Sequence, residues 1–69
     1  MLDIHLTPKE KSILKLLTKG LTNNDISNIL GNSHKTIATH LMHINYKLHT
    51  STRTEAVIVA LKLNLIPVG

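Results

Sequence analysis

Apolar residues recur along the chain at the spacing of α-helices, in runs separated by short polar turns. Three runs begin with a threonine that is followed three residues later by an acid: Thr7 with Glu10, Thr22 with Asp25, and Thr52 with Glu55. Such a pair closes a capping box at a helix N-terminus, and Ser33 offers a simpler cap for a further helix. The runs are followed by residues that tolerate a left-handed backbone, at Gly20, Gly31 and Asn64. Because no alternation of apolar and polar residues indicates a strand, the pattern predicts an all-α fold of four helices.

The third predicted helix, residues 33–48, has two distinct faces. At 100° per residue, four aliphatic side chains fall within about 60° of one another and form a core-facing stripe: Ile37, Leu41, Ile44 and Leu48. The opposite face carries Lys35, Thr39, Met42 and Tyr46. This outer face contains no acid and suits the major groove of DNA, which is roughly 12 Å wide and accepts one helix.

The residues that lead into this helix have the spacing of a helix-turn-helix motif. The small Ser27 lets two helices approach, Gly31 makes the turn, and Ile37 fixes the crossing. Short helix pairs with these features also occur in domains that bind no DNA, so the motif alone leaves the function open.

The fourth predicted helix, residues 53–63, is apolar on two faces. The face that we expect to meet the core holds Ala56, Val59, Ala60 and Leu63. The other face holds Val57, Ile58 and Leu61. A helix that is apolar nearly all round needs two burial partners, and the second is predicted to be another copy of the chain. In the alternative interpretation, Val57 and Leu61 close the core against the first helix and Ile58 stays half exposed.

Length and composition predict one small domain. The 69 residues are expected to have an ordered core over about residues 6–66, preceded by a loose lead-in over residues 1–6. The chain has no cysteine, which excludes disulfides and thiolate zinc sites. No apolar run approaches the roughly 18 residues of a membrane span and no signal peptide opens the chain, so we expect a cytoplasmic protein with no membrane partner.

The distribution of charge favours a polyanionic partner. Eight Lys and Arg against four Asp and Glu give a formal net charge of +4. Asp25 and Glu55 are consecutive acids, so residues 26–54 contain none, although they include Lys35, Lys47, Arg53 and four histidines. An acid-free basic stretch is typical of nucleic-acid binding, whereas a small basic domain that is only well solvated is the alternative.

The histidines do not form a catalytic or metal-binding pattern. His40 and His43 are three positions apart on one helix, but the nearest acids in the sequence are Asp25 and Glu55 and there is no cysteine. No nucleophile, base and orienting group can be assembled from the chain. We therefore expect no enzyme activity, no catalytic residue, no cofactor and no metal.

Taken together, these signatures resemble the LuxR-type (NarL/GerE-type) DNA-binding domain over residues 6–66. The similar stretches, in order, are Leu6-Thr7-Pro8-Lys9-Glu10, Gly20-Leu21-Thr22-Asn23 with Asp25-Ile26, Leu30-Gly31, residues 33–40, and Lys47-Leu48 with Arg53-Thr54-Glu55-Ala56. The resemblance implies a four-helix, bundle-like helix-turn-helix domain whose third helix is the recognition helix. It also implies a transcriptional regulator that is usually dimeric on paired half-sites. In most members this module lies C-terminal to a receiver or ligand-sensing domain, and small standalone members exist.

Several residues depart from the family pattern. Asn32 replaces an aliphatic residue in the turn, and Asn24 replaces a frequent lysine. Ala38 and Met42 occupy positions where relatives often carry Lys or Arg that read base edges. These two side chains offer only apolar contact, for example to a thymine methyl group.

The resemblance and the pattern together predict a DNA-binding surface on residues 33–48. Its expected members are Lys35, Thr36, Ala38, Thr39, His40, Met42, His43 and Lys47. Thr39 is the leading candidate for a base contact, and Lys35 is interpreted as a base contact, a phosphate contact or a solvated lysine. Thr36 is a candidate for a phosphate contact or for a hydrogen bond within the helix, whereas His43 and Lys47 are candidates for phosphate contacts. His40 lies beside the core stripe and is interpreted either as a half-buried structural residue or as a further phosphate contact.

Two functional hypotheses follow. In the first, the chain is a sequence-specific regulator that binds double-stranded DNA, or the C-terminal DNA-binding domain of one, and forms a weak homodimer through Val57, Ile58 and Leu61. In the second, it is an interaction module of the same fold that pairs with another regulator through helix 53–63. The uncharged Ala38 and Met42 favour the second hypothesis, and the absence of acids from residues 26–54 favours the first.

Overall fold

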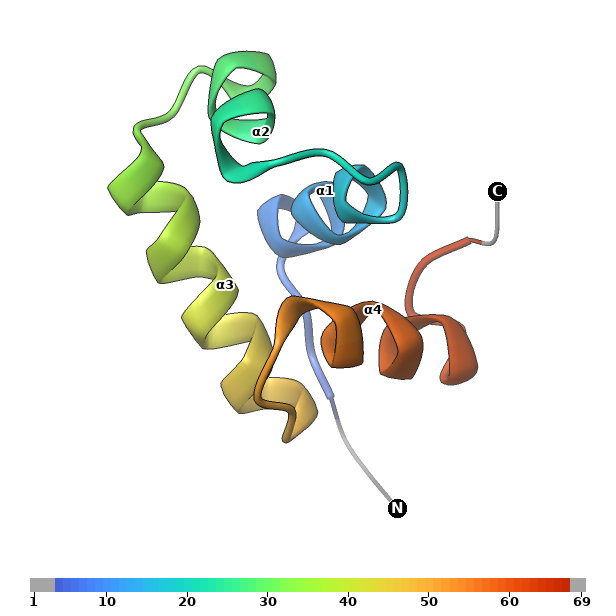
Figure 1. Ribbon diagram of the computed structural model, residues 1–69. Helices are drawn as coiled ribbons and strands as arrows, with labels where there is room; N and C mark the ends of the chain where they lie inside the picture. The colour runs from blue at the N-terminus through green and yellow to red at the C-terminus, as the bar shows by residue number, and fades with distance from the viewer. Residues whose placement is uncertain (1–3, 68–69) are drawn as a thin grey trace.

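The computed structural model describes residues 4–67, which form four helices and no strand (Figure 1). These helices are α1 (Pro8–Leu17), α2 (Asn23–Leu30), α3 (His34–Leu48) and α4 (Arg53–Lys62). Helix α1 packs against both α3 and α4, while α3 contacts α2 near its start and α4 near its end. The all-α prediction is confirmed. Over residues 4–67, no helix is both long enough and apolar enough to cross a membrane.

Each helix begins at the cap that the sequence predicts. The side chains of Thr7, Thr22 and Thr52 each accept a hydrogen bond from the third helical N–H, and the acid at that position accepts one from the threonine N–H in return. Ser33 Oγ accepts from the N–H of Thr36 at 3.1 Å. Because these bonds satisfy N–H groups that have no partner within the helix, they fix where each helix starts.

The helices also end near the turn residues that the sequence predicts, with one difference in α1. Gly20, Gly31 and Asn64 have positive φ angles of 76°, 70° and 57°, and His49 joins them at 57°. Helix α1, however, ends at Leu17, three residues before the turn residue Gly20 at which its end was predicted. The chain tightens there because the N–H groups of Lys19 and Gly20 donate to carbonyls three residues back instead of four.

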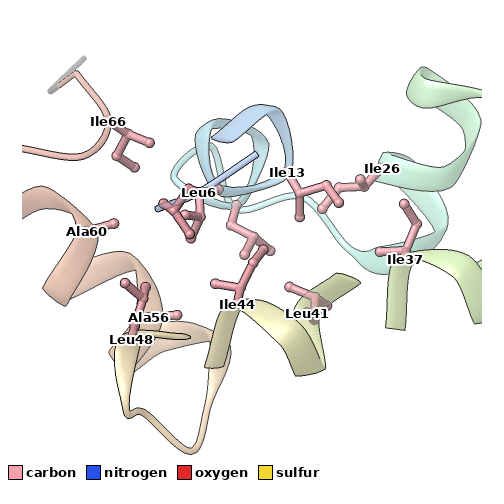
Figure 2. Close-up of a cluster of buried hydrophobic side chains, with 12 residues drawn as sticks. Leu6, Ile13, Ile26, Ile37, Leu41, Ile44, Leu48, Ala56, Ala60 and Ile66 are labelled. Carbon is pink, nitrogen blue, oxygen red and sulfur yellow. The ribbon is translucent and has the colours of Figure 1, made fainter. Parts of the chain in front are cut away.

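The core is built from aliphatic side chains of every helix and of both flanking segments (Figure 2). Its buried members are Leu6, Ile13, Leu14, Leu17, Ile26, Ile37, Leu41, Ile44, Leu48, Ala56, Ala60 and Ile66. The stripe predicted on α3 is confirmed, because its four residues all belong to this cluster. These side chains extend from α3 toward α1, which leaves the opposite side of α3 free of helices (Figure 1).

Two expectations about the chain ends were wrong. Leu6 is buried and Ile4 packs against the core, so the described part of the lead-in is anchored and not loose. Leu63, expected in the core, is 42% exposed. Helix α4 ends at Lys62, and the left-handed Asn64 then reverses the chain so that Ile66 reaches the core instead.

Candidate nucleic-acid interface

The turn between α2 and α3 is held by a compact set of backbone bonds. Gly31 caps α2 in the left-handed conformation, and its N–H donates to the carbonyl of Ser27. The N–H of Asn32 donates to the same carbonyl at 3.0 Å, so one oxygen closes the helix end twice. Ser27 is buried, as expected of the small residue at the crossing, and Ile37 of α3 is fully buried. Together they fix the angle at which α3 leaves the turn.

A side-chain bond links the first turns of α2 and α3. His34 Nε2 lies 2.7 Å from Asn24 Oδ1, at a spacing of ten residues in the sequence. The sequence indicates Asn24 only as the replacement of a lysine and gives His34 no role of its own beyond being one of the histidines of the basic stretch. The structure gives the two residues a joint role, because their contact ties the start of α3 to α2.

An ion pair fixes the other end of α3. Lys47 Nζ donates to Glu10 Oε1 at 2.7 Å, and the same oxygen accepts from the N–H of Thr7 at 2.8 Å. Glu10 is only 3% exposed, although it belongs to the capping box of α1. The sequence predicted Glu10 as a cap and Lys47 as a phosphate contact. The structure joins them, so the Lys47 ammonium holds α3 against α1.

The environment of Glu10 favours its ionised form. Burial raises the pKa of the carboxyl, but the hydrogen bond from Lys47, the backbone bond from Thr7 and the positive charge of Lys47 together outweigh burial and leave the pKa below its ordinary value. The ion pair is therefore intact at neutral pH.

The remaining residues of the expected DNA-binding surface lie on the side of α3 that no helix covers. The exposed members are Lys35, Thr36, Ala38, Thr39, Met42 and His43. His40 is half-buried, which fits its expected place beside the core stripe, and Lys47 is half-buried in its ion pair. Helix α3 thus presents one continuous outer face without an acidic side chain.

The two threonine hydroxyl groups on this outer face are already engaged within the protein. Thr39 Oγ1 donates to the carbonyl of Lys35 at 3.0 Å. Thr36 Oγ1 lies 3.0 Å from Ser33 Oγ at the helix cap. Thr39 therefore presents its methyl group and an oxygen that can accept, while its proton is used in the helix.

Helix α4 matches the alternative interpretation of its second apolar face. Val57 and Leu61 are half-buried and pack against the core, whereas Ile58 is 47% exposed. Ile58 lies at the rim of a surface hollow of about 360 Å³ between the end of α1 and the start of α4. The apolar surface available to a partner is therefore smaller than the strip of three residues implied.

Asn32 is the weak point of the turn. Its side-chain nitrogen is buried and finds no acceptor among the described residues. We expect Asn32→Val to raise the free energy of unfolding by about 1 kcal/mol, because the substitution removes an unpaired polar group and keeps a compatible backbone. Urea denaturation followed by circular dichroism measures the change.

The exposed Asn28 on α2 provides the matched control, since Asn and Val have similar helix propensities. Asn28→Val is expected to shift stability by less than about 0.5 kcal/mol. Equal effects of the two substitutions, or a loss of stability in Asn32→Val, contradict the assignment of Asn32 as an unsatisfied position.

Comparison with known proteins agrees with this geometry. Residues 5–60 match the model of the family described as bacterial regulatory proteins, luxR family. The chain is 43% identical over 61 residues to the response regulator protein VraR of Staphylococcus aureus, covering 88% of this chain and 29% of VraR. It is 40% identical over 63 residues to the probable transcriptional regulator ycf29 of Porphyra purpurea, covering 91% of this chain and 30% of ycf29.

Solved structures show the same arrangement of helices. The response regulator ChrA of a heme-sensing two-component system superposes with a TM-score of 0.88 and 39% identity, over 90% of this chain and 31% of ChrA. The transcription factor GerE superposes with a TM-score of 0.85 and 34% identity, over 90% of this chain and 92% of GerE. The chain thus spans about 30% of the length of the curated relatives cited above and nearly all of GerE. It belongs to the luxR family of bacterial regulatory proteins, whose shared helix-turn-helix domain regulates transcription by binding DNA and is not an enzyme.

Proposed function

We propose that this domain recognises specific sequences in double-stranded DNA by placing α3 in the major groove. The observation that carries the proposal is the outer face of α3, which is exposed along its length, free of acids and fixed in direction at both ends. The His34–Asn24 contact holds the start of the helix, and the Lys47–Glu10 pair holds its end. A helix presented in this way fits a groove roughly 12 Å wide without rearrangement.

The proposed contacts of α3 divide into those with base edges and those with the DNA phosphates, which position the helix in the groove. Lys35, Ala38, Thr39 and Met42 lie on the outward line of α3 and are proposed to meet base edges. Thr36, His40 and His43 flank that line and are proposed to meet phosphates, with Lys47 acting chiefly through Glu10. The exposed Arg53 at the start of α4 supplies a further positive charge.

Selection of bound sequences from a random duplex pool tests the proposal. We expect one half-site sequence to be enriched. A dimer that neutralises about six to eight phosphates should then bind the enriched duplex with a log–log salt slope of about −5 to −7. The absence of any enriched sequence, or an affinity that does not depend on salt, overturns sequence-specific groove binding.

We further propose that the domain works as a weak homodimer on paired half-sites in the cytoplasm. An interface centred on one exposed isoleucine buries less than the roughly 1,000 Å² of a stable interface, so DNA must supply the effective concentration that brings two copies together. The length of the response-regulator relatives supports the use of this module as the output part of a larger regulator behind a receiver domain. The match to nearly all of GerE supports its use alone. Both arrangements use the same DNA-binding surface.

The dimer proposal gives a specific prediction for Ile58. Ile58→Glu is expected to leave the fold and single half-site binding nearly unchanged, because its side chain is half exposed and lies on α4, away from the outer face of α3. It should reduce cooperative occupancy of a double site at least tenfold by placing two carboxylates at the twofold contact. Gel-shift titrations of single and double sites measure both quantities.

Leu61→Glu serves as the contrasting variant. Because Leu61 packs against the core, this substitution is expected to destabilise the domain as a whole and to weaken single-site binding too. Unchanged cooperativity in Ile58→Glu places the dimer contact elsewhere.

A second candidate function is pairing with a different regulator through α4. The hollow lined by Leu17, Leu21, Val57 and Ile58 favours it, because it offers an apolar recess beside an exposed isoleucine. This role predicts that the Ile58→Glu variant loses a protein partner while the wild-type domain shows no preference among duplex sequences.

A further inference from the structure

The outer face of α3 carries an apolar line where a DNA-reading helix usually presents polar groups. Ala38, Met42 and Tyr46 are spaced four residues apart and lie on one side of the helix. Met42 is 62% exposed and Tyr46 is 83% exposed, so neither side chain is buried by the fold. The line has no packing role within the described domain that explains it.

The two threonine hydroxyl groups beside this line are already engaged in hydrogen bonds within the protein. The Thr39 hydroxyl donates to the Lys35 carbonyl, and the Thr36 hydroxyl is paired with Ser33. Lys35, His43 and, further along the helix, the Tyr46 hydroxyl are the exposed polar groups of this face whose side chains form no hydrogen bond within the described residues. The centre of the face, between Lys35 and His43, therefore presents the methyl groups of Ala38 and Thr39 and the thioether of Met42.

We propose that this central patch, made of Ala38, Thr39 and Met42, reads the C5-methyl groups of thymine. The inference rests on the proposed function and names the chemical feature that the face recognises. Thymine is the base whose major-groove edge carries a methyl group, and apolar side chains are the groups that contact it. The patch spans about 6 Å along the helix, which corresponds to about two base-pair steps. The half-site thus contains thymines within two or three consecutive base pairs.

The surroundings of the patch favour DNA over a protein as its occupant. Lys35 lies at one end and His43 beside the other, and residues 26–54 contain no acid. Basic side chains on both borders of the patch attract the phosphates on the two sides of a DNA groove, whereas they add no attraction for an apolar protein surface. The same patch also accepts 5-methylcytosine, because this base carries its methyl group at the same position of the major-groove edge.

Replacing individual thymines by deoxyuridine in the enriched duplex tests the proposal. This change removes the methyl group and keeps every hydrogen-bonding group of the base. We expect affinity to fall about fourfold for each methyl group in contact, equivalent to about 0.8 kcal/mol. A cytosine placed at the same position should bind weakly, and 5-methylcytosine there should recover part of the affinity.

Two variants assign the effect to the patch. Met42→Gln keeps the length of the side chain and makes it polar, so the loss on deoxyuridine substitution should shrink to less than about 1.5-fold at one base position. Lys35→Ala should weaken binding to thymine and deoxyuridine duplexes equally and keep their ratio. Circular dichroism of both variants verifies the fold, which is expected to be intact because both side chains are exposed.

The outcomes separate this inference from the proposed function. An enriched half-site without thymine, or equal affinity for thymine and deoxyuridine duplexes, overturns methyl reading and leaves DNA binding in place. The absence of any enriched duplex overturns both. A protein partner whose binding is lost in Met42→Gln, together with unselective DNA binding, assigns the patch to protein contact instead.

Discussion

Replacing Glu10 by alanine is expected to lower the free energy of unfolding by about 3 kcal/mol, which is a large share of the stability of a 69-residue domain. The substitution removes the acceptor for both the Thr7 N–H and the Lys47 ammonium. It therefore opens the capping box of α1 and releases the end of α3 in one step. Breaking a buried pair costs about 3–5 kcal/mol, and the partial exposure of Lys47 places this case at the lower end.

The partner substitution separates the ion pair from the cap. Lys47→Ala keeps the capping box but leaves a buried carboxylate without its counter-charge, and should cost about 2 kcal/mol. In a double-mutant cycle of Glu10→Ala and Lys47→Ala, we expect a coupling energy of about 1–2 kcal/mol. Lys11→Ala, at an exposed position of α1, is the control and should change stability by less than about 0.5 kcal/mol. A coupling energy near zero contradicts the structural role of the pair.

The Glu10–Lys47 ion pair also makes the stability of the domain fall at low pH. Because the pKa of Glu10 is lower in the folded domain than in the unfolded chain, its contribution is fully present above the ordinary carboxyl value of 4.5. It is lost as the pH falls through the lowered pKa of the folded state, since protonation removes the charge that Lys47 requires. Glu10→Gln should remove this part of the pH dependence, and urea midpoints measured between pH 3 and pH 6 would show a flatter profile.

Ile37→Ala is the second substitution with a large expected effect. Ile37 is fully buried and lies beside Ile26 at the crossing of α2 and α3 (Figure 2). Its truncation leaves a cavity at the point that sets the angle between the two helices, and we expect a loss of about 3 kcal/mol in the free energy of unfolding. Binding to the enriched duplex should weaken as well, because α3 loses its fixed direction.

Met42→Ala provides the control on the same helix. Its side chain is largely exposed, so the expected change in stability is less than about 0.5 kcal/mol although a longer side chain is removed. Urea denaturation of both variants makes the comparison. Similar losses of stability in the two contradict the assignment of the inner and outer faces of α3.

The starts of the helices and the faces of α3 could be predicted from the sequence because both depend on local spacing. A capping box needs residues three positions apart, and a core stripe needs helical periodicity over a few turns. Each of these signals lies within one element. The four caps and the buried stripe of α3 therefore appear in the structure where the pattern placed them.

The contacts that orient α3 could not be predicted in the same way. Lys47 and Glu10 are 37 positions apart, and His34 and Asn24 are ten apart on different helices. Glu10 was predicted as a cap and Lys47 as a phosphate contact, and no local pattern in the sequence indicated either of these contacts between distant residues. Their meeting depends on the crossing angles of the helices, which arise from packing of the whole core.

Leu63 shows a different limit of periodicity. Its position fits the core-facing side of a helix that continues through residue 63, but α4 ends one residue earlier. The sequence predicts that Asn64 tolerates the left-handed conformation, but the pattern does not indicate that the chain reversal there brings Ile66 into the core. The backbone conformation after a helix end decides which later residues face the core. A helical wheel that is extended past that end therefore assigns those residues to the wrong face.

The proposal that the outer face of α3 contacts duplex DNA is tested most directly by an NMR titration of the 69-residue chain with the enriched duplex. We expect the largest chemical-shift changes at Lys35, Thr39, Met42 and His43, with smaller changes at the start of α2 and little change in the second half of α4. A control duplex of scrambled sequence should produce the same pattern at lower affinity. Shifts centred on Ile58 and its neighbours in α4, or no shifts on the outer face of α3, contradict the reading of DNA by this helix.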